Sequence, residues 1–249
     1  MILIPVKSFR GAKQRLSSVL DAQERAALAR AMFEDVLVAL AGWILRPPIA
    51  VVTADAEARR IACQFGCGII EDSARAGETE AIASATRWCE ARKVWRTLVI
   101  PADIPLLAAG EVESIFQAAD VLGRSARRAT GYSVLSPAAD GRGTNAALRS
   151  PPGLFPLRFG NDSFEPHLRA ARATGLPSCL LRFPGIGLDI DRPADLAALL
   201  AAENRTRSQE LLRTWRVPER LARLQGGRLL HAARAARGSA GVNQSHQRV

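Results

Sequence analysis

Apolar runs alternate with amphipathic stretches along the first half of the chain. The runs are four or five residues long and show little polar alternation, which is typical of strands buried on both faces of a sheet. They predict strands over residues 2–6, 49–53, 68–71 and 97–100. Between them the apolar residues recur at helical spacing, and Asp21 with Glu24 predicts a capping box at the first helix. The predicted helices span residues 21–40, 55–65, 78–92 and 109–122.

The second half of the chain is patterned less regularly. A glycine-rich turn at residues 140–143 and a proline-rich loop around residues 151–156 interrupt it. The predicted elements there are strands over 130–135, 178–183 and 186–190 and helices over 163–173 and 193–202. Because strands and helices alternate across long connections, we predict an α/β fold with a mainly parallel sheet and helices on both of its faces.

Basic residues are concentrated at the end of the chain. The 249 residues carry a formal net charge of +10, from 34 Lys and Arg against 24 Asp and Glu. Residues from 204 onward hold ten Arg and two Glu, a charge of +8, which leaves +2 for residues 1–203. We therefore predict a nearly neutral domain over residues 1–203 and a basic, Arg-rich extension over residues 204–249. The extension is expected to be helical at first and disordered later.

Other compositional features favour a cytoplasmic protein without a metal-sulfur site. No apolar run approaches the roughly 18–20 residues that a membrane span needs. The first residues, MILIPVK, resemble a strand more than a signal peptide. The four cysteines show no CxxC spacing and lie far from the histidines, which favours reduced thiols and argues against zinc.

A basic loop follows the first predicted strand. Lys7, Arg10, Lys13 and Arg15 lie within nine residues of one another. In a parallel sheet, ligands bind at the carboxyl ends of the strands, and cationic side chains there can neutralise a polyphosphate. A solvated surface loop would have the same composition, so both interpretations stay open. The sequence lacks the P-loop and GxGxxG motifs.

Three aspartates occupy further strand ends. Asp103 follows the fourth predicted strand, and Asp189 and Asp191 alternate in the segment LDIDRP. In an extended segment, residues i and i+2 share a face, so both carboxylates could approach one ion. With phosphate oxygens as further ligands, the three carboxylates predict a Mg²⁺ site. The alternative is that Asp103 and Asp191 cap helices.

Two segments of small polar residues are candidates for anion binding. They are residues 143–145 and 159–164, which present backbone N–H groups and hydroxyls. Ser163 also precedes a predicted helix, whose N-terminus would favour an anion. Turns and caps use the same residue types, so this pattern alone is weak.

Five segments occur in an order that resembles the 2-phospho-L-lactate guanylyltransferase family (CofC/FbiD). They are PVKSFRGAKQRLSSVL (5–20), PADIPLL (101–107), GRGTNAAL (141–148), FPLRFGNDSF (155–164) and GIGLDIDRPADL (185–196). The resemblance covers residues 1–200. It implies a three-layer nucleotidyltransferase fold of the GT-A-like, Rossmann-like kind, so that residues 1–203 would form a nucleotidyltransferase domain.

The resemblance also implies a reaction. A phosphorylated three-carbon acid would attack the α-phosphate of GTP and release pyrophosphate, as a step in the biosynthesis of the deazaflavin coenzyme F-420. The acid would be 2-phospho-L-lactate, phosphoenolpyruvate or 3-phospho-D-glycerate, of which we favour the last. The product would pass to a downstream deazaflavin transferase. A homodimer stays open, and no membrane partner is expected.

Site residues follow from the matching motifs. Lys13 and Arg15 would neutralise the GTP phosphates, with Lys7 nearby, and Asp103, Asp189 and Asp191 would hold Mg²⁺. Thr144, Gly160 and Ser163 would bind the phosphate and carboxylate of the acid, and Asn145 is a further substrate-binding candidate. Where the family more often has a Gly-Leu-Asn element, this chain has Gly77, Glu78, Thr79 and Glu80. Glu80 could read guanine, or simply favour the helix dipole.

Two alternatives remain beside the guanylyltransferase. A molybdenum-cofactor or sugar-phosphate nucleotidyltransferase would keep the fold, but such enzymes usually carry a glycine-rich loop after the first strand, where this chain has only Gly11. The second alternative is a nucleic-acid-binding protein that acts through its Arg-rich extension. Trp215 is the only aromatic residue there for stacking, and the nearly neutral domain argues against it.

Overall fold

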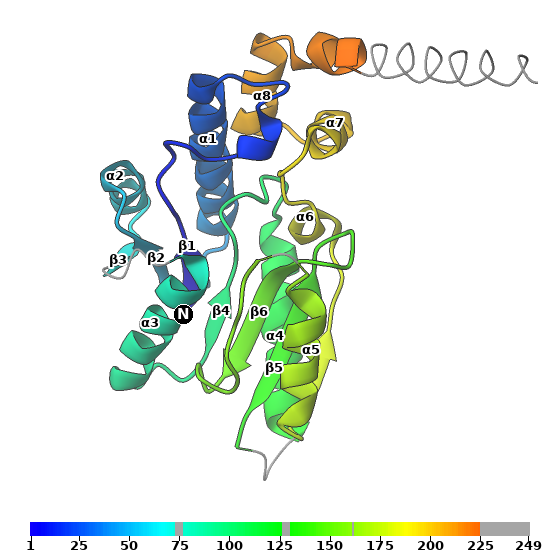
Figure 1. Ribbon diagram of the computed structural model, residues 1–249. Helices are drawn as coiled ribbons and strands as arrows, with labels where there is room; N and C mark the ends of the chain where they lie inside the picture. Colours follow the sequence, from blue (N-terminus) through cyan, green and yellow to red (C-terminus); the bar gives the residue numbers. More distant parts are fainter. Residues whose placement is uncertain (73–76, 126–129, 161, 225–249) are drawn as a thin grey trace, which may run out of the picture.

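A seven-stranded sheet forms the centre of the protein in the computed structural model, which describes residues 1–72, 77–125, 130–160 and 162–224 (Figure 1). The strand order is β3-β2-β1-β4-β6-β5-β7. The strands are β1 (Ile2–Pro5), β2 (Ile49–Thr53), β3 (Gly68–Glu71), β4 (Thr97–Val99), β5 (Tyr132–Pro137), β6 (Thr144–Ser150) and β7 (Ser178–Leu180).

Helices connect most of these strands. They are α1 (Ala22–Ala41), α2 (Ala56–Gln64), α3 (Glu78–Ala91), α4 (Ala109–Ser125), α5 (Phe164–Ala173), α6 (Pro184–Gly187), α7 (Pro193–Ala201) and α8 (Arg207–Thr214), with a 3-10 turn η1 at Gln14–Leu16. The predicted capping box of α1 is present, since Asp21 accepts from the backbone of Glu24 and Glu24 accepts from that of Asp21. Within the described ranges, no helix is both long and apolar enough to cross a membrane.

The sheet is mainly parallel, as predicted. β1 pairs in parallel with β2 and β4, β2 with β3, and β5 with β7. β6 is the exception and runs antiparallel to both β4 and β5. Because β6 is reversed, its first residues lie at the edge of the sheet where β4 ends.

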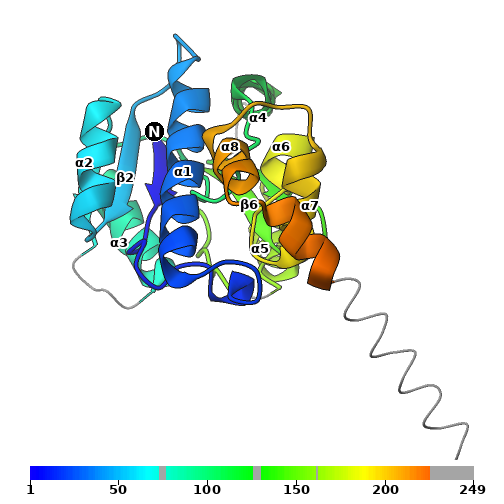
Figure 2. The same ribbon diagram turned by 90° about the horizontal axis from the view of Figure 1, so that it is seen from above.

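Each face of the sheet is covered by its own apolar cluster, which gives three layers. On β1, Ile2 and Ile4 pack with residues of α1, α2, α4, α7 and α8, whereas Leu3 packs with residues of α3 and α5. This alternation follows from the two-residue period of a strand. It confirms helices on both faces, and Figure 2 shows α1 and α8 side by side.

Two predicted elements are wrong. Residues 143–145 were expected in a loop, but Thr144 and Asn145 begin β6 and are buried. Residues 186–190 were expected to form a strand, but Pro184–Gly187 form the short helix α6. The carboxylate of Glu111 on α4 accepts from the N–H groups of Gly185 and Ile186 and so caps this helix. A tertiary cap of this kind leaves no trace in local sequence.

Residues 207–224 of the predicted extension share the core of the domain. α8 packs against α1, and Leu212, Val217 and Leu221 are buried in the larger apolar cluster. Asp35 on α1 accepts from the N–H and hydroxyl of Ser208, which fixes the start of α8. The chain is helical again over 217–224, and residues 225–249 lie outside the described residues.

We expect replacement of Leu212 by alanine to destabilise the domain. Leu212 is 0% exposed, and truncation of a buried leucine costs about 2–5 kcal/mol because it leaves a cavity. Denaturant unfolding of the Leu212→Ala protein should show this loss, whereas the neighbouring, half-exposed Leu211→Ala protein should lose far less. Equal losses would mean that α8 does not belong to the core.

Candidate active site

Three adjoining cavities lie at the carboxyl ends of the strands. The largest, of about 760 Å³, lies beyond β1, β2 and β3, and a second of about 440 Å³ lies between the loop after β1 and the loop after β4. Residues 6–10 line both of them. A third, of about 320 Å³, is bounded by the turn before β6 and the loop after α6, and it shares Asp191 with the second. Together they form a groove across the carboxyl ends of the strands, and we call them the first, second and third cavities.

The centre of this groove is an ion-pair cluster. The Lys13 ammonium lies 2.5 Å from Asp103 and 2.7 Å from Asp191, and the Arg15 guanidinium lies 3.4 Å from Asp191. The Lys13 side chain is only 9% exposed. Three segments that the sequence analysis singled out separately therefore meet at one point. Lys13 and Asp103 follow the strands β1 and β4, whereas Asp191 follows the helix α6 and not a strand.

Neither aspartate of the cluster acts as a helix cap. α7 is capped instead by Asp195, whose carboxylate accepts from the N–H groups of Asp191 and Arg192. The Asp191 carboxylate faces Lys13. One oxygen of Asp103 also meets Lys13, while the other, Oδ1, is buried without a hydrogen-bond partner in the described part of the chain.

The electrostatics of the cluster hold Lys13 in its charged form. Burial alone would lower the pKa of Lys13, but the Asp103 and Asp191 carboxylates raise it above its ordinary value. For Asp191, burial opposes ionisation, and the charges of Lys13 and Arg15 outweigh it and lower the pKa. The cluster therefore keeps fixed charges of both signs at the bottom of the groove.

Lys13 also has a strained backbone. Its φ of 53° and ψ of 43° lie in the left-handed region, which a residue with a Cβ rarely adopts. Such a conformation costs on the order of 1–3 kcal/mol and persists where the surroundings fix it. Here the two carboxylates hold the ammonium, and this backbone conformation directs the Lys13 side chain towards the carboxyl ends of the strands and away from solvent.

Asp189 is anchored by a different set of contacts. Its carboxylate accepts from the Asn145 side-chain amide at 3.0 Å, and the same amide donates to the Ile186 carbonyl at 2.9 Å. Burial raises the pKa of Asp189, and the carboxylates of Asp103 and Asp191 add to this rise, while the Asn145 hydrogen bond opposes it. Asn145 therefore fixes the position of the segment that carries Asp189, because its amide bonds to both Ile186 and Asp189.

Glu78 is a site residue that the sequence analysis missed. It lies at the start of α3 and lines the second cavity together with Lys7, Lys13 and Asp103. Burial, followed by the nearby Asp103 charge, raises the pKa of Glu78 to about 7, although Lys7 and Lys13 lower it. The signal was present in the sequence, because Glu78 directly follows Gly77 in the segment that departs from the family pattern.

The segments around Thr144 and Ser163 meet on the far side of the groove. Ser163 Oγ accepts from the Thr144 N–H at 3.1 Å, and both residues are about 95% buried, with 6% and 5% exposure. Gly160 lines the third cavity, together with Arg142 and Asp162, which form an ion pair at its rim. The structure thus places Gly160 on the cavity surface and Thr144 and Ser163 just behind it.

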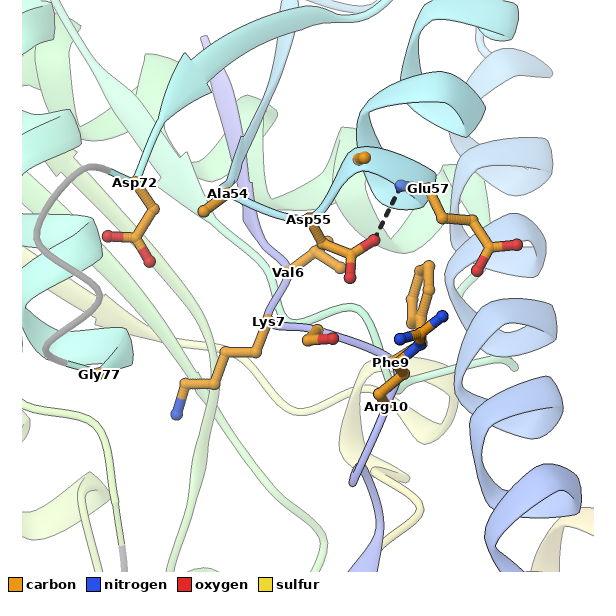
Figure 3. A pocket seen from close by; sticks show the side chains of 11 residues that line it. Val6, Lys7, Phe9, Arg10, Ala54, Asp55, Glu57, Asp72 and Gly77 are labelled. Carbon is orange, nitrogen blue, oxygen red and sulfur yellow. Dashed lines mark hydrogen bonds between the residues drawn. The ribbon is translucent and has the colours of Figure 1, made fainter.

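The remaining predicted residues lie in different surroundings. Lys7 is exposed and lines the first cavity, as Figure 3 shows, and it also lines the second, while Arg15 lines the third. Glu80 is exposed on the first turn of α3 and lies outside the lining of all three cavities. Its position suits the helix dipole.

The carboxylates do not converge as a ready-made metal cage. Among the described residues, no group of three or more His, Cys, Asp or Glu side chains is placed to hold a metal ion. Lys13 lies between Asp103 and Asp191 instead. The buried, unpartnered Oδ1 of Asp103 nevertheless fits a cation, because a buried polar atom without a partner is costly and Mg²⁺ prefers carboxylate oxygens.

Comparison with known proteins identifies the family. The family described as "Guanylyl transferase CofC like" matches residues 1–230. The chain belongs to this guanylyl transferase family. It is therefore an enzyme of the nucleotidyltransferase class, and the family resemblance inferred from the five segments is confirmed.

Curated CofC-like relatives match over most of their length. A phosphoenolpyruvate guanylyltransferase of Conexibacter woesei is 35% identical, over 85% of this chain and 96% of that protein. A 3-phospho-D-glycerate guanylyltransferase of Colwellia psychrerythraea is 34% identical, over 84% and 95%. A 2-phospho-L-lactate guanylyltransferase of Methanothermobacter thermautotrophicus is 31% identical, over 86% and 90%.

Solved structures support the fold. A crystal structure from Desulfovibrio desulfuricans superposes with a TM-score of 0.67 at 20% identity, covering 89% of this chain and 96% of that one. A cytidylyltransferase of Leptospira borgpetersenii superposes with a TM-score of 0.53 at 11% identity, covering 88% and 94%. At these identities the likeness establishes the shared fold of this CofC-like chain and nothing about its substrate.

Proposed function

We propose that this protein joins GTP to a phosphorylated three-carbon acid and releases pyrophosphate. The observation that carries the proposal is the Lys13–Asp103–Asp191 cluster, which lies between a large cavity and a smaller one. The nucleoside fits the first cavity, its phosphates the second and the acid the third. The α-phosphate then lies beside Lys13.

The reaction requires that the two substrates are positioned and that their negative charges are neutralised. A phosphate oxygen of the acid forms a bond to the α-phosphorus of GTP, and the bond from that phosphorus to the α–β bridging oxygen breaks. The nucleophile is already an anion, so no general base is needed. The barrier comes from bringing two anions together, and fixed cations such as Lys13 and Arg15 lower it.

We also propose a Mg²⁺ ion held by Asp103, Asp189 and Asp191. When bound, the ion would neutralise charge on the phosphates. The contribution of the chain itself is to keep the ligands ionised and in place. Lys13 holds Asp103 and Asp191 in place and lowers the pKa of Asp191, and Asn145 orients the Asp189 carboxylate.

Base recognition is assigned to Asp72 in place of Glu80. Asp72 follows β3 and extends towards the part of the first cavity between Lys7 and Gly77 (Figure 3). A carboxylate there can accept hydrogen bonds from N1–H and N2–H₂ of guanine.

We expect the Asp72→Asn protein to lose selectivity for GTP. A hydrogen bond to a charged group contributes about 1.5–3 kcal/mol, so KM for GTP should rise about 10- to 100-fold while the rate with ATP changes little. The matched control is Glu71→Gln, which removes a neighbouring carboxylate that pairs with Arg59 outside the cavity. A loss of GTP selectivity in Glu80→Gln and not in Asp72→Asn would place base recognition on α3.

The acid and the pathway are further parts of the proposal. The relatives' names include all three acids, and we favour 3-phospho-D-glycerate because the segment 77–81 departs from the family pattern. We place the reaction in coenzyme F-420 biosynthesis in the cytoplasm, with the product passed to a deazaflavin transferase. The nucleic-acid alternative is weakened by the described part of the extension, where Arg207 and Arg220 pair with Glu34 and Glu24 and Trp215 packs against the core.

Pyrophosphate release tests the proposal. The protein is supplied with Mg²⁺, GTP and each of the three acids in separate reactions, and ATP and CTP replace GTP as controls. Release that needs GTP and one of the acids is expected. A folded sample that binds GTP but releases pyrophosphate with none of the three acids would contradict the proposed acceptor class.

A further inference from the structure

His167 lies behind the acid side of the groove and has no role in the reaction as described so far. It sits on α5, one turn after Ser163, and is 1% exposed. Its Nδ1 lies 2.9 Å from the Thr144 hydroxyl, and its Nε2 accepts from the Arg158 N–H at 2.7 Å. The ring also packs against that of Phe159 in a T-shaped arrangement, with ring centroids 5.5 Å apart.

These contacts fix the proton on one ring nitrogen. The Arg158 backbone N–H can only donate, so Nε2 must present its lone pair. The single proton of the neutral ring is then on Nδ1, where it is donated to Thr144 Oγ1. Burial, reinforced by the positive charge of Arg149, lowers the pKa of His167 to about 4, so the ring is neutral at ordinary pH.

We propose that His167 is a positioning residue for the side of the third cavity that is formed by residues 143–144 and 158–160, which we call the acid-binding wall. One ring joins two segments that are distant in sequence, because it donates to Thr144 at the start of β6 and accepts from Arg158 in the loop before α5. The inference rests on the proposed function, since the substrate acid is placed in the third cavity. That cavity is lined by Gly143, which precedes Thr144, and by Gly160, which lies two residues after Arg158.

The orientation of the Thr144 hydroxyl follows from this arrangement. Thr144 Oγ1 accepts from His167 Nδ1 and, at 3.4 Å, from the Ser163 hydroxyl. With both lone pairs engaged, the hydroxyl group acts towards any further partner as a donor. An anionic phosphate or carboxylate offers only acceptors. By donating to Thr144 Oγ1, His167 therefore leaves the Thr144 hydroxyl as a donor, which is the role that an anion requires.

A second anchor holds the same loop independently. Thr79 Oγ1 accepts from the Phe159 N–H at 2.9 Å and donates to the Phe159 carbonyl at 3.3 Å. Thr79 belongs to α3, on the nucleotide side of the groove. Because Thr79 retains the loop, loss of the His167 hydrogen bonds should displace the wall without unfolding the domain.

Three substitutions separate the two hydrogen bonds. His167→Phe removes both, His167→Asn retains an amide near Nδ1 that can donate to Thr144, and His167→Gln retains a carbonyl near Nε2 that can accept from Arg158. We expect KM for the acid to rise at least 10-fold in His167→Phe, with KM for GTP changed less than threefold. The Asn and Gln variants should fall between it and the wild type, and all three variants should still unfold cooperatively. Parallel rises of both KM values, or a wild-type KM for the acid in all three variants, would overturn the proposal.

Nitrogen-15 NMR of the imidazole rings tests the same geometry without any substrate. The chain has three histidines, and the His167 signals are those that disappear in His167→Phe. A protonated Nδ1 and an unprotonated Nε2 at neutral pH are expected. A proton on Nε2, or a charged ring, would refute the assignment. If the wild type proves inactive with every acid, the proposed function fails, while the NMR result still decides the position of the proton.

Discussion

The Asp103→Asn protein should remain folded and lose at least 10³-fold in kcat. Asp103 is the carboxylate that meets Lys13 with one oxygen and keeps the other buried without a partner in the described chain. An amide in its place cannot offer the charge that a cation on the phosphates requires. Removal of one preorganised electrostatic group typically costs about 10²–10³ in kcat, and the loss of a metal ligand adds to it.

The measurement is single-turnover pyrophosphate release, together with thermal unfolding. The matched control is Asp120→Asn, because Asp120 also pairs with a basic residue, Arg96, but does so beside the start of β4, at the opposite end of the strands from the groove. This control should retain wild-type kcat. Near-normal turnover in Asp103→Asn would remove the carboxylate from the reaction and with it the proposed metal site.

Replacement of Lys13 by methionine should lower kcat/KM for GTP by about 10³-fold or more. The methionine keeps the length of the side chain but removes the charge that offsets Asp103 and Asp191. Those two carboxylates would then repel the triphosphate. Because the effect is electrostatic, GTP binding should weaken strongly while guanosine binding stays within about threefold.

Lys93→Met is the matched control for Lys13→Met. Lys93 has the same unusual backbone, with a φ of 57° against 53°, and is exposed after the end of α3. The control should retain wild-type activity and GTP affinity. If Lys13→Met weakened guanosine and GTP equally, Lys13 would serve the structure of the groove and would not neutralise the phosphates.

The sequence predicted the parallel half of the sheet well because its signals are local. Strands 2–6, 49–53 and 68–71 are short apolar runs, and the Asp21 capping box marks α1 before any tertiary contact is known. β6 was missed because Thr144 and Asn145 are polar residues that are buried through tertiary contacts. Their partners, Ser163 and Asp189, lie 19 and 44 residues further along the chain.

The site shows the same division between local and distant signals. Charge type and position after β1 and β4 were enough to select Lys13 and Asp103, since parallel strands bring their carboxyl ends together. Asp191 was selected from its spacing to Asp189, although the strand predicted over 186–190 is absent. Glu78 and His167 were overlooked because a glutamate at a helix start and a lone histidine in a helix are common. Their importance arises from burial beside the groove, which only the folded chain reveals.

Phosphorus-31 NMR of the reaction mixture tests the central claim most directly, because it reports which phosphorus atoms become linked. With GTP, Mg²⁺ and the accepted acid, the account predicts two coupled resonances of a new diphosphate that joins guanosine to the acid, in equal amount to free pyrophosphate. Release of GDP and inorganic phosphate, or pyrophosphate with GMP alone, would show that the groove hydrolyses the nucleotide and would contradict transfer to an acid.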